Sequence, residues 1–208
     1  NLGPDPADLP VRTLTEPVVS LATGHDLAEL TDLQAFSLYR SETVRNNDSS
    51  ESLLQRLGIA DPQAAAFMRS NNDVRQNILG RVGRLVSAEV TSQHELSKLT
   101  VRWAPDDDGT FKRLIVERKD GKLATRTETD KLVATPRLAG GIVRNSFFTT
   151  TDDAGIPDSI AVQMADIFQS ELDFHRGIRK GDRFAVAYEA LEADGEPLRA
   201  GRVLSAEF

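Results

Sequence analysis

The sequence predicts an α+β protein of two small domains, each with short helices packed on an antiparallel sheet or hairpins, after an extended or helical N-terminal arm. Two observations support this fold class. Short runs of alternating apolar and polar residues, separated by turn residues, are typical of antiparallel strands. A few other stretches repeat apolar residues every three or four positions, as amphipathic helices do. We therefore divide the chain into an arm (1–40), a first domain (41–133) and a second domain (134–208).

The composition argues against several classes of protein. The 208 residues include 25 Lys and Arg against 32 Asp and Glu, a net charge of −7, whereas nucleic-acid binding requires a clustered basic excess. The absence of cysteine excludes disulfides and cysteine-ligated metal sites. No stretch approaches the roughly 20 consecutive apolar residues of a membrane-spanning helix. We therefore expect neither a nucleic-acid partner nor a membrane span.

The arm begins with an extended segment, because residues 1–16 contain three prolines and little apolar periodicity. Apolar residues then recur at helical spacing, which predicts a short amphipathic helix over 25–39 on the basis of Leu27, Leu30, Leu33 and Phe36. The chain starts at Asn1 rather than at a methionine. Removal of an export signal or trimming of the chain would both produce that start.

The first domain is predicted to open with the end of a strand and two helices, over residues 43–45, 51–57 and 61–72. The polar run Asn46–Ser50 supplies side-chain oxygens that suit a helix N-terminus, and Gly58 suits the end of that helix. Asp61 as N-cap, with Pro62 at the first helical position, begins the second helix.

The rest of the first domain is predicted to be an antiparallel meander. Alternating residues over 85–90 and 96–103 flank a polar turn and indicate a hairpin. Asp120-Gly121, between two β-favouring runs, is the strongest short hairpin signal in the chain, and its arms are 111–116 and 122–133.

The second domain is predicted to contain a strand, a helix and a hairpin, after a joint at 134–136 and 140–141. The strand is expected over 142–148, the helix from Pro157 to about Ser170, and the hairpin around Asp194-Gly195 with a last strand over 202–208. Gly83 and Gly181 each stand between a helix and an alternating strand. That arrangement is common and does not require an internal repeat.

No catalytic or metal-binding motif is present. The three histidines, His25, His94 and His175, form none of the zinc signatures, and the chain has no nucleophile elbow or phosphate-binding loop. The acidic run 106–108 favours a solvated turn over a calcium loop. The basic cluster within 176–183 favours a salt-bridged surface over an anion site. The residues alone therefore indicate a binding or structural module without its own active site.

Several segments nevertheless resemble a known family. Residues 152–168, 173–176 and 179–184 closely resemble the region before the catalytic domain of lysostaphin/LytM-type murein endopeptidases (metallopeptidase family twenty-three). The ending 201–208 is similar to the family's strand that leads towards that domain, and the resemblance extends over 41–208. These enzymes are periplasmic zinc metallopeptidases that cut peptide cross-links of peptidoglycan in Gram-negative bacteria.

The resemblance implies that the first domain is a LysM-like or OapA-like module. The family's turn before its helices stands here as Asn47-Asp48-Ser49-Ser50, with Asn47 in place of the usual glycine and Ser50 where an apolar residue is common. Carried over by position, the glycan-binding residues would be Asp48, Ser49, Ser50, Asn71 and Asn72. The alternative is that these residues only cap helices.

The family's zinc site requires a His-x-x-x-Asp element and a His-x-His element, and this chain has neither. The resemblance therefore implies the non-catalytic N-terminal region of an exported enzyme, with no metal or other cofactor in this chain and zinc in a missing catalytic domain. The expected partners are peptidoglycan and that peptidase domain, and the expected location is the periplasm. The alternative is a stand-alone peptidoglycan-binding or adaptor protein without hydrolase activity.

Overall fold

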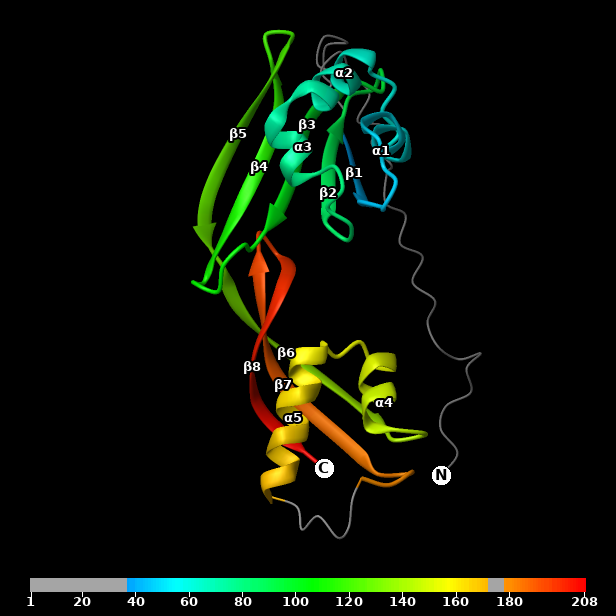
Figure 1. Cartoon of the computed structure of the whole chain (residues 1–208), viewed down its shortest axis with the longest axis vertical. Coiled ribbons are helices and arrows are strands. Elements are labelled where there is room, and N and C mark those ends of the chain that lie inside the picture. The colour runs from blue at the N-terminus through cyan, green and yellow to red at the C-terminus, as the bar shows by residue number, and fades with distance from the viewer. Residues whose placement is uncertain (1–36, 172–177) are drawn as a thin grey trace, which may run out of the picture. The chain divides into compact units, whose positions relative to one another are not determined.

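The computed structural model describes residues 37–171 and 178–208, which form two antiparallel sheets and five short helices (Figure 1). The α+β class is therefore confirmed. The predicted arm up to residue 36, with most of the helix expected over 25–39, lies outside the described residues. The end of that helix prediction is wrong, because Leu38 and Tyr39 belong to the first strand, where pairing with a neighbouring strand overrides the local helical spacing.

The first sheet has five antiparallel strands, in the order β1-β2-β3-β4-β5. The predicted hairpins are confirmed. The Asp120-Gly121 turn has φ angles of 50° and 75°, the left-handed values that a two-residue type I′ turn requires. The strands are β1 (Leu38–Thr43), β2 (Leu85–Val90), β3 (Leu96–Trp103), β4 (Thr110–Lys119) and β5 (Lys122–Lys131).

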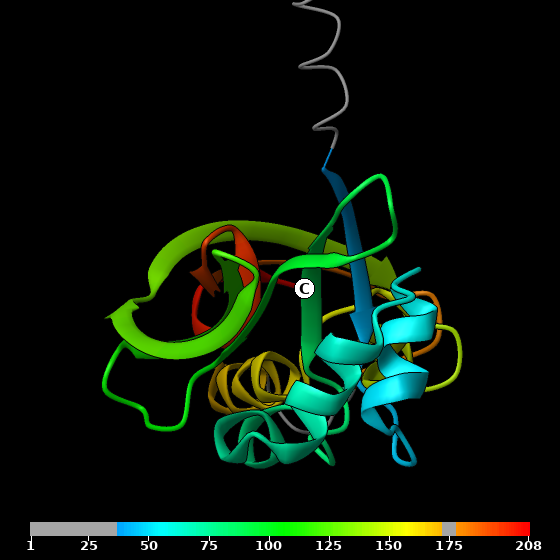
Figure 2. The same ribbon diagram turned by 90° about the horizontal axis from the view of Figure 1, so that it is seen from above.

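Three short helices connect β1 to β2 and pack on one face of this sheet (Figures 1 and 2). The second begins as predicted, since the Asp61 side chain accepts the Ala64 N–H at 3.0 Å. The third is missing from the sequence prediction. Asn71 ends one helix and caps the next, with its Oδ1 accepting the Val74 N–H. The helices are α1 (Ser50–Arg56), α2 (Pro62–Ser70) and α3 (Asn72–Asn77).

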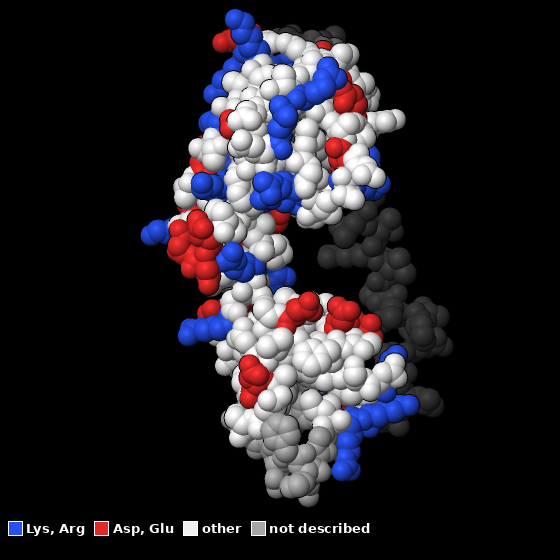
Figure 3. Space-filling view, viewed as in Figure 1, with Lys and Arg blue, Asp and Glu red and all other residues white. Residues whose placement is uncertain are grey.

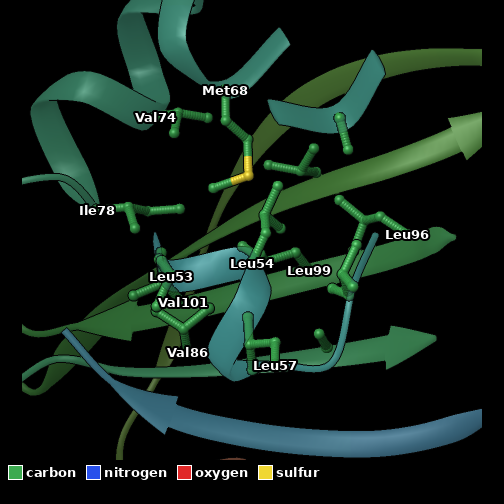
Figure 4. Close-up of a cluster of buried hydrophobic side chains, with 14 of the residues drawn as sticks. Leu53, Leu54, Leu57, Met68, Val74, Ile78, Val86, Leu96, Leu99 and Val101 are labelled. Atoms are coloured by element: carbon green, nitrogen blue, oxygen red, sulfur yellow. The ribbon is translucent and has the colours of Figure 1, made fainter. Parts of the chain in front are cut away.

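A hydrophobic core lies between these helices and the sheet (Figure 4). Every second residue of β2 is buried, so alternate side chains enter the core. Removing this apolar surface from water stabilises the fold by about 25 cal/mol per Å². The labelled core side chains are Leu53, Leu54, Leu57, Met68, Val74, Ile78, Val86, Leu96, Leu99 and Val101.

The other face of the first sheet is polar over β1, β2 and β3, and we call it the helix-free face, since none of the described helices packs on it. The strand register places Tyr39 beside Glu89, Glu89 beside Lys98, and Ser87 beside Thr100. The alternation that builds the core therefore also collects polar side chains on one surface.

The second sheet has the order β6-β7-β8 and packs on two further helices. The buried side of the predicted helix is confirmed, because Ile160, Met164 and Phe168 all lie in this second hydrophobic cluster. The predicted turn at Asp194-Gly195 is also confirmed, with φ angles of 51° and 83°. The elements are β6 (Val133–Ile142), α4 (Phe147–Asp153), α5 (Asp158–Glu171), β7 (Arg183–Ala193) and β8 (Glu196–Glu207).

The segments 134–136 and 140–141, which the sequence indicates as a joint between domains, both lie inside β6. This strand pairs with β7 along its whole length and forms an edge of the sheet, where Pro136 is tolerated. Gly140 permits a close approach of the two strands, since a Cβ there would lie 2.6 Å from the carbonyl oxygen of Phe184. Division of the chain into domains at 133/134 stays a prediction.

The strand expected over 142–148 is wrong beyond its first residue, because β6 ends at Ile142 and Phe147 and Phe148 begin α4. Aromatic and threonine residues favour strands, but Ser146 caps this helix by accepting the Thr149 N–H at 3.1 Å. Capping and burial of Phe147 against Phe184 outweigh the local preference.

In each sheet, the first strand is followed by the same pattern of backbone hydrogen bonds between a buried valine and a glycine turn. Directly after β1, the buried Val44 donates to the Arg84 carbonyl and accepts the Gly83 N–H, both at 2.9 Å. After β6, the buried Val143 makes the same pair of bonds, both at 2.8 Å, with Gly181 and the residue that follows it. Both glycines have positive φ, so the similarity noted in the sequence is also a similarity of backbone geometry.

The described core predicts that substitution by alanine lowers the free energy of unfolding much more at Val86 than at Val82. Val86→Ala removes two buried methyl groups, and we expect it to lower the free energy of unfolding by about 2 kcal/mol. Val82→Ala, at a side chain that is 60% exposed, should change it by less than about 0.5 kcal/mol. Urea unfolding of both variants measures the difference, and equal losses would contradict the described core.

Candidate binding sites

Asp48 and Ser49, two of the residues predicted to bind glycan, lie in the N-terminal cap of α1. Ser49 Oγ accepts the Ser52 N–H at 3.1 Å, and Ser52 Oγ accepts the Ser49 N–H at 2.9 Å, which is a capping box. The Asp48 carboxylate accepts the Arg45 backbone N–H and an N–H of Arg56 Nη2, both at 2.7 Å. The polar atoms of Asp48 and Ser49 are therefore used in hydrogen bonds at the N-terminal end of α1.

The ion pair between Asp48 and Arg56 is nearly buried on the carboxylate side, which is 4% exposed. The hydrogen bonds from Arg56 hold the pKa of Asp48 far below its usual range, against burial, which acts in the opposite direction. Arg56 Nη2 also donates to the Thr43 carbonyl at 3.0 Å, and its Nε donates to Glu42 at 3.3 Å. The pair therefore ties α1 to the end of β1.

The other three predicted residues lie at the N-terminal ends of α1 and α3. Ser50 is buried, and its Oγ has no hydrogen-bond partner among the described residues. Asn71 uses Oδ1 in the cap of α3, and its Nδ2 donates to Thr125 Oγ1 at 3.5 Å. Asn72 is the first residue of α3 and is exposed. None of the five predicted residues lines the pocket or the groove described next.

A pocket of about 440 Å³ lies between α1 and α2, and its charged groups are paired. Glu51 binds Arg69, while Asp61 accepts bonds from two backbone N–H groups and from Arg118. Burial acts to raise the pKa of Asp61, but these bonds outweigh it and leave the pKa below its usual value. The rest of the lining is mainly apolar: Leu54, Ile59, Ala60, Pro62 and Ala65.

A groove of about 550 Å³ crosses the helix-free face and is bordered by the β7–β8 turn. We call it the sheet-face groove. It combines hydroxyl groups, both signs of charge and one exposed aromatic ring, and such a mixture suits a polar ligand with an apolar part. Its lining residues are Tyr39, Leu85, Ser87, Ala88, Glu89, Lys98, Thr100, Arg102, Asp194, Gly195, Glu196 and Pro197.

Two arginines of the first sheet hold the turn at the edge of this groove. Arg113 binds both carboxylate oxygens of Asp194, from Nε at 2.8 Å and Nη2 at 2.6 Å, and Arg102 donates to the same carboxylate. The hydrogen bond from Arg113 is the main reason that the pKa of Asp194 is lowered, against the effect of burial. Glu196 lies 3.7 Å from Arg102, and burial raises its pKa.

The sheet-face groove was not predicted from the sequence. The alternating pattern of β2 and β3 was a usable signal, since it places Ser87, Glu89, Lys98 and Thr100 on one face. The contact with the turn had no such signal, because Asp194 lies 92 positions from Arg102 in the sequence.

Within 37–171 and 178–208, no group of three or more His, Cys, Asp or Glu side chains is placed to hold a metal ion. His94 is the histidine that lies in this part of the chain, and its Nδ1 is 3.2 Å from the Gly58 carbonyl oxygen. No helix in the described part is long and apolar enough to cross a membrane. Basic and acidic side chains are interspersed over the face shown in Figure 3.

Two curated relatives of this chain are bacterial DD-peptidases. The chain is 20% identical over 166 residues to the peptidoglycan DD-endopeptidase ShyC of Vibrio cholerae serotype O1, a match covering 79% of this chain and 37% of the relative. It is 24% identical over 166 residues to the DD-carboxypeptidase/endopeptidase Mpg of Neisseria gonorrhoeae, covering 80% and 38%. The chain thus spans less than two fifths of the length of these relatives. No model of a known protein family matches it.

Solved structures match more weakly. A zinc-containing peptidase from Vibrio cholerae is 16% identical with a TM-score of 0.36, covering 80% of this chain and 48% of that one. Csd3 from Helicobacter pylori, in its hexagonal crystal, is 10% identical with a TM-score of 0.46, covering 80% and 44%. These scores are too low to support an argument from the fold.

The buried ion pair predicts a pH-dependent cost for Asp48→Asn. We expect this variant to lower the free energy of unfolding at pH 7 by about 2 kcal/mol, because Arg56 loses its main charged partner. A carboxylate with a lowered pKa contributes stability above the unfolded-state pKa of about 3.9, and that contribution is lost in acid. Wild type and variant should therefore converge as the pH falls below about 4.

Urea unfolding across this pH range measures the effect. Asp153→Asn, at an exposed carboxylate in the last turn of α4, is the matched control and should change stability by less than about 0.5 kcal/mol. A difference between wild type and Asp48→Asn that persists undiminished in acid would show that the ion pair is not its source.

Proposed function

We propose that this chain is the non-catalytic, peptidoglycan-targeting and regulatory portion of a zinc metallopeptidase that cleaves peptide cross-links in the bacterial cell wall. The similarity to peptidoglycan peptidases over about 80% of the chain, against 37–38% of their length, carries this proposal. The chain has no His-x-His element. The zinc and the water that it activates would therefore belong to a peptidase domain that follows this region.

Two parts of the first sheet and its helices support the targeting role. The N-terminal ends of α1 and α3 carry Asp48, Ser49, Ser50, Asn71 and Asn72, which we propose as the glycan-binding residues of a LysM-like module. The sheet-face groove adds a second polar surface. The similarity to a peptidoglycan DD-endopeptidase of Vibrio cholerae and a DD-carboxypeptidase/endopeptidase of Neisseria gonorrhoeae supports a periplasmic location, which we propose for this protein.

The regulatory role is an intramolecular contact with the peptidase domain. Holding 99% of molecules in a closed state requires about 2.7 kcal/mol. One modest interface between domains supplies a free energy of that size. Binding of the wall to this region would then compete with closure and release the peptidase where its substrate is.

The targeting role predicts that the purified chain sediments with peptidoglycan sacculi and releases no soluble fragments from them. Sedimentation at two salt concentrations, with bovine serum albumin as an unrelated acidic control, measures retention. If the chain stays in the supernatant like the control, the targeting role is wrong.

The regulatory role predicts that the reading frame continues beyond Phe208 into a domain with His-x-x-x-Asp and His-x-His elements. Added in trans, the present chain should lower the activity of that domain on cross-linked sacculi in a saturable way. A stop codon directly after Phe208 would instead favour a stand-alone binding or adaptor protein, and unchanged activity at saturating chain would exclude inhibition.

A further inference from the structure

The sheet-face groove contains two charged side chains that the fold leaves unpaired. Glu89 of β2 and Lys98 of β3 lie directly opposite each other across the two strands. Neither side chain has a hydrogen bond or an ion pair with any described residue. Both are half-buried, so each loses part of its hydration without gaining a partner.

The other charged groups of the groove are already used by the fold. Arg102 contacts both Asp194 and Glu196, and the two oxygens of Asp194 are bound by Arg113. These groups form a fixed wall at the turn, which leaves Lys98 and Glu89 as the pair of charges that the described contacts do not satisfy.

The groove is also lined by an aromatic ring and by two side-chain hydroxyl groups. The Tyr39 side chain, 77% exposed, lies next to Glu89 in the strand register. Its ring is attached to an edge strand and offers a broad apolar surface at little cost in side-chain entropy. Ser87 and Thr100 face each other across β2 and β3 and supply neutral hydrogen-bonding groups.

We propose that the sheet-face groove binds the stem peptide of peptidoglycan, with a carboxylate of the peptide at Lys98, an ammonium group at Glu89 and an apolar part of the peptide against Tyr39. The identification of the ligand rests on the proposed function, which supplies peptidoglycan as the partner. The chemistry of the groove selects the peptide within that polymer.

The charge pattern favours the peptide over the glycan. A stem peptide with free carboxylates and a free amine satisfies both signs of charge, each by a charge-assisted hydrogen bond. An uncharged N-acetylated sugar would cover Lys98 and Glu89 without pairing either charge, which costs desolvation free energy. The groove therefore differs in ligand from the glycan site proposed at the ends of α1 and α3.

Calorimetric titration of the whole chain with a synthetic stem tetrapeptide tests this proposal, with an uncharged chitin tetrasaccharide as the second ligand. We expect the tetrapeptide to bind, and Lys98→Gln and Glu89→Gln each to weaken that binding by about tenfold, because each removes one charge-assisted hydrogen bond. Neither substitution should change binding of the tetrasaccharide. Raising the salt from about 50 mM to about 500 mM should weaken tetrapeptide binding to the wild type.

Two matched variants serve as controls. Lys112→Gln and Glu95→Gln remove the same charges from exposed positions outside the groove, and both should bind the tetrapeptide as the wild type does. Thermal unfolding checks that all variants are folded, and the salt dependence of the wild type does not rely on any variant.

The outcomes separate this inference from the proposed function. If the chain sediments with sacculi but the tetrapeptide does not bind, or binds equally to Lys98→Gln and Lys112→Gln, the groove is not a stem-peptide site although wall targeting stands. If the chain fails to sediment with sacculi yet binds the tetrapeptide through Lys98 and Glu89, the groove assignment holds and the targeting role fails.

Discussion

The alternation of side chains along the central strands of the first sheet is the constraint on which the rest of this structure depends. In β2, Val86, Ala88 and Val90 are buried under the helices, while Ser87 and Glu89 face the other way. A slip of one residue would bring the polar set under the helices and expose the apolar set. One pattern therefore defines both the core and the polar face that carries the sheet-face groove.

Charged side chains on the two faces of the first sheet differ in whether the fold pairs them. On the helix side, Asp48 and Asp61 are nearly buried, and each accepts hydrogen bonds from an arginine and from at least one backbone N–H group. Their charges hold α1 and α2 to the sheet, and removing either partner would leave an uncompensated buried charge. On the helix-free face, Lys98 and Glu89 have no such role in the described contacts, which is why we assign them to a ligand rather than to the fold.

Local signals in the sequence were sufficient where one residue determines the backbone. Asp61-Pro62 begins a helix, and Asp120-Gly121 and Asp194-Gly195 form turns with positive φ, so these elements could be predicted. β6 could not, because Pro136 and Gly140 argue against a strand until its pairing with β7 is known. α4 was missed because the cap at Ser146 and the packing of Phe147 are decided by tertiary contacts.

The two candidate binding sites also differ in how far the sequence alone predicts them. The five predicted glycan-binding residues were found through family resemblance, and three of them, Asp48, Ser49 and Asn71, also have capping or ion-pair roles that account for their side-chain chemistry. The groove depends on strand register and on the distant Asp194 turn, neither of which a single sequence reveals. Perturbation mapping by NMR of the amide signals of the isotope-labelled chain, titrated with a soluble disaccharide-tetrapeptide, is the most direct test of ligand binding in the sheet-face groove. We predict shifts in β2 and β3 around Glu89 and Lys98 and no cleavage of the ligand. No shifts, shifts confined to the second sheet, or appearance of cleavage products would contradict this prediction.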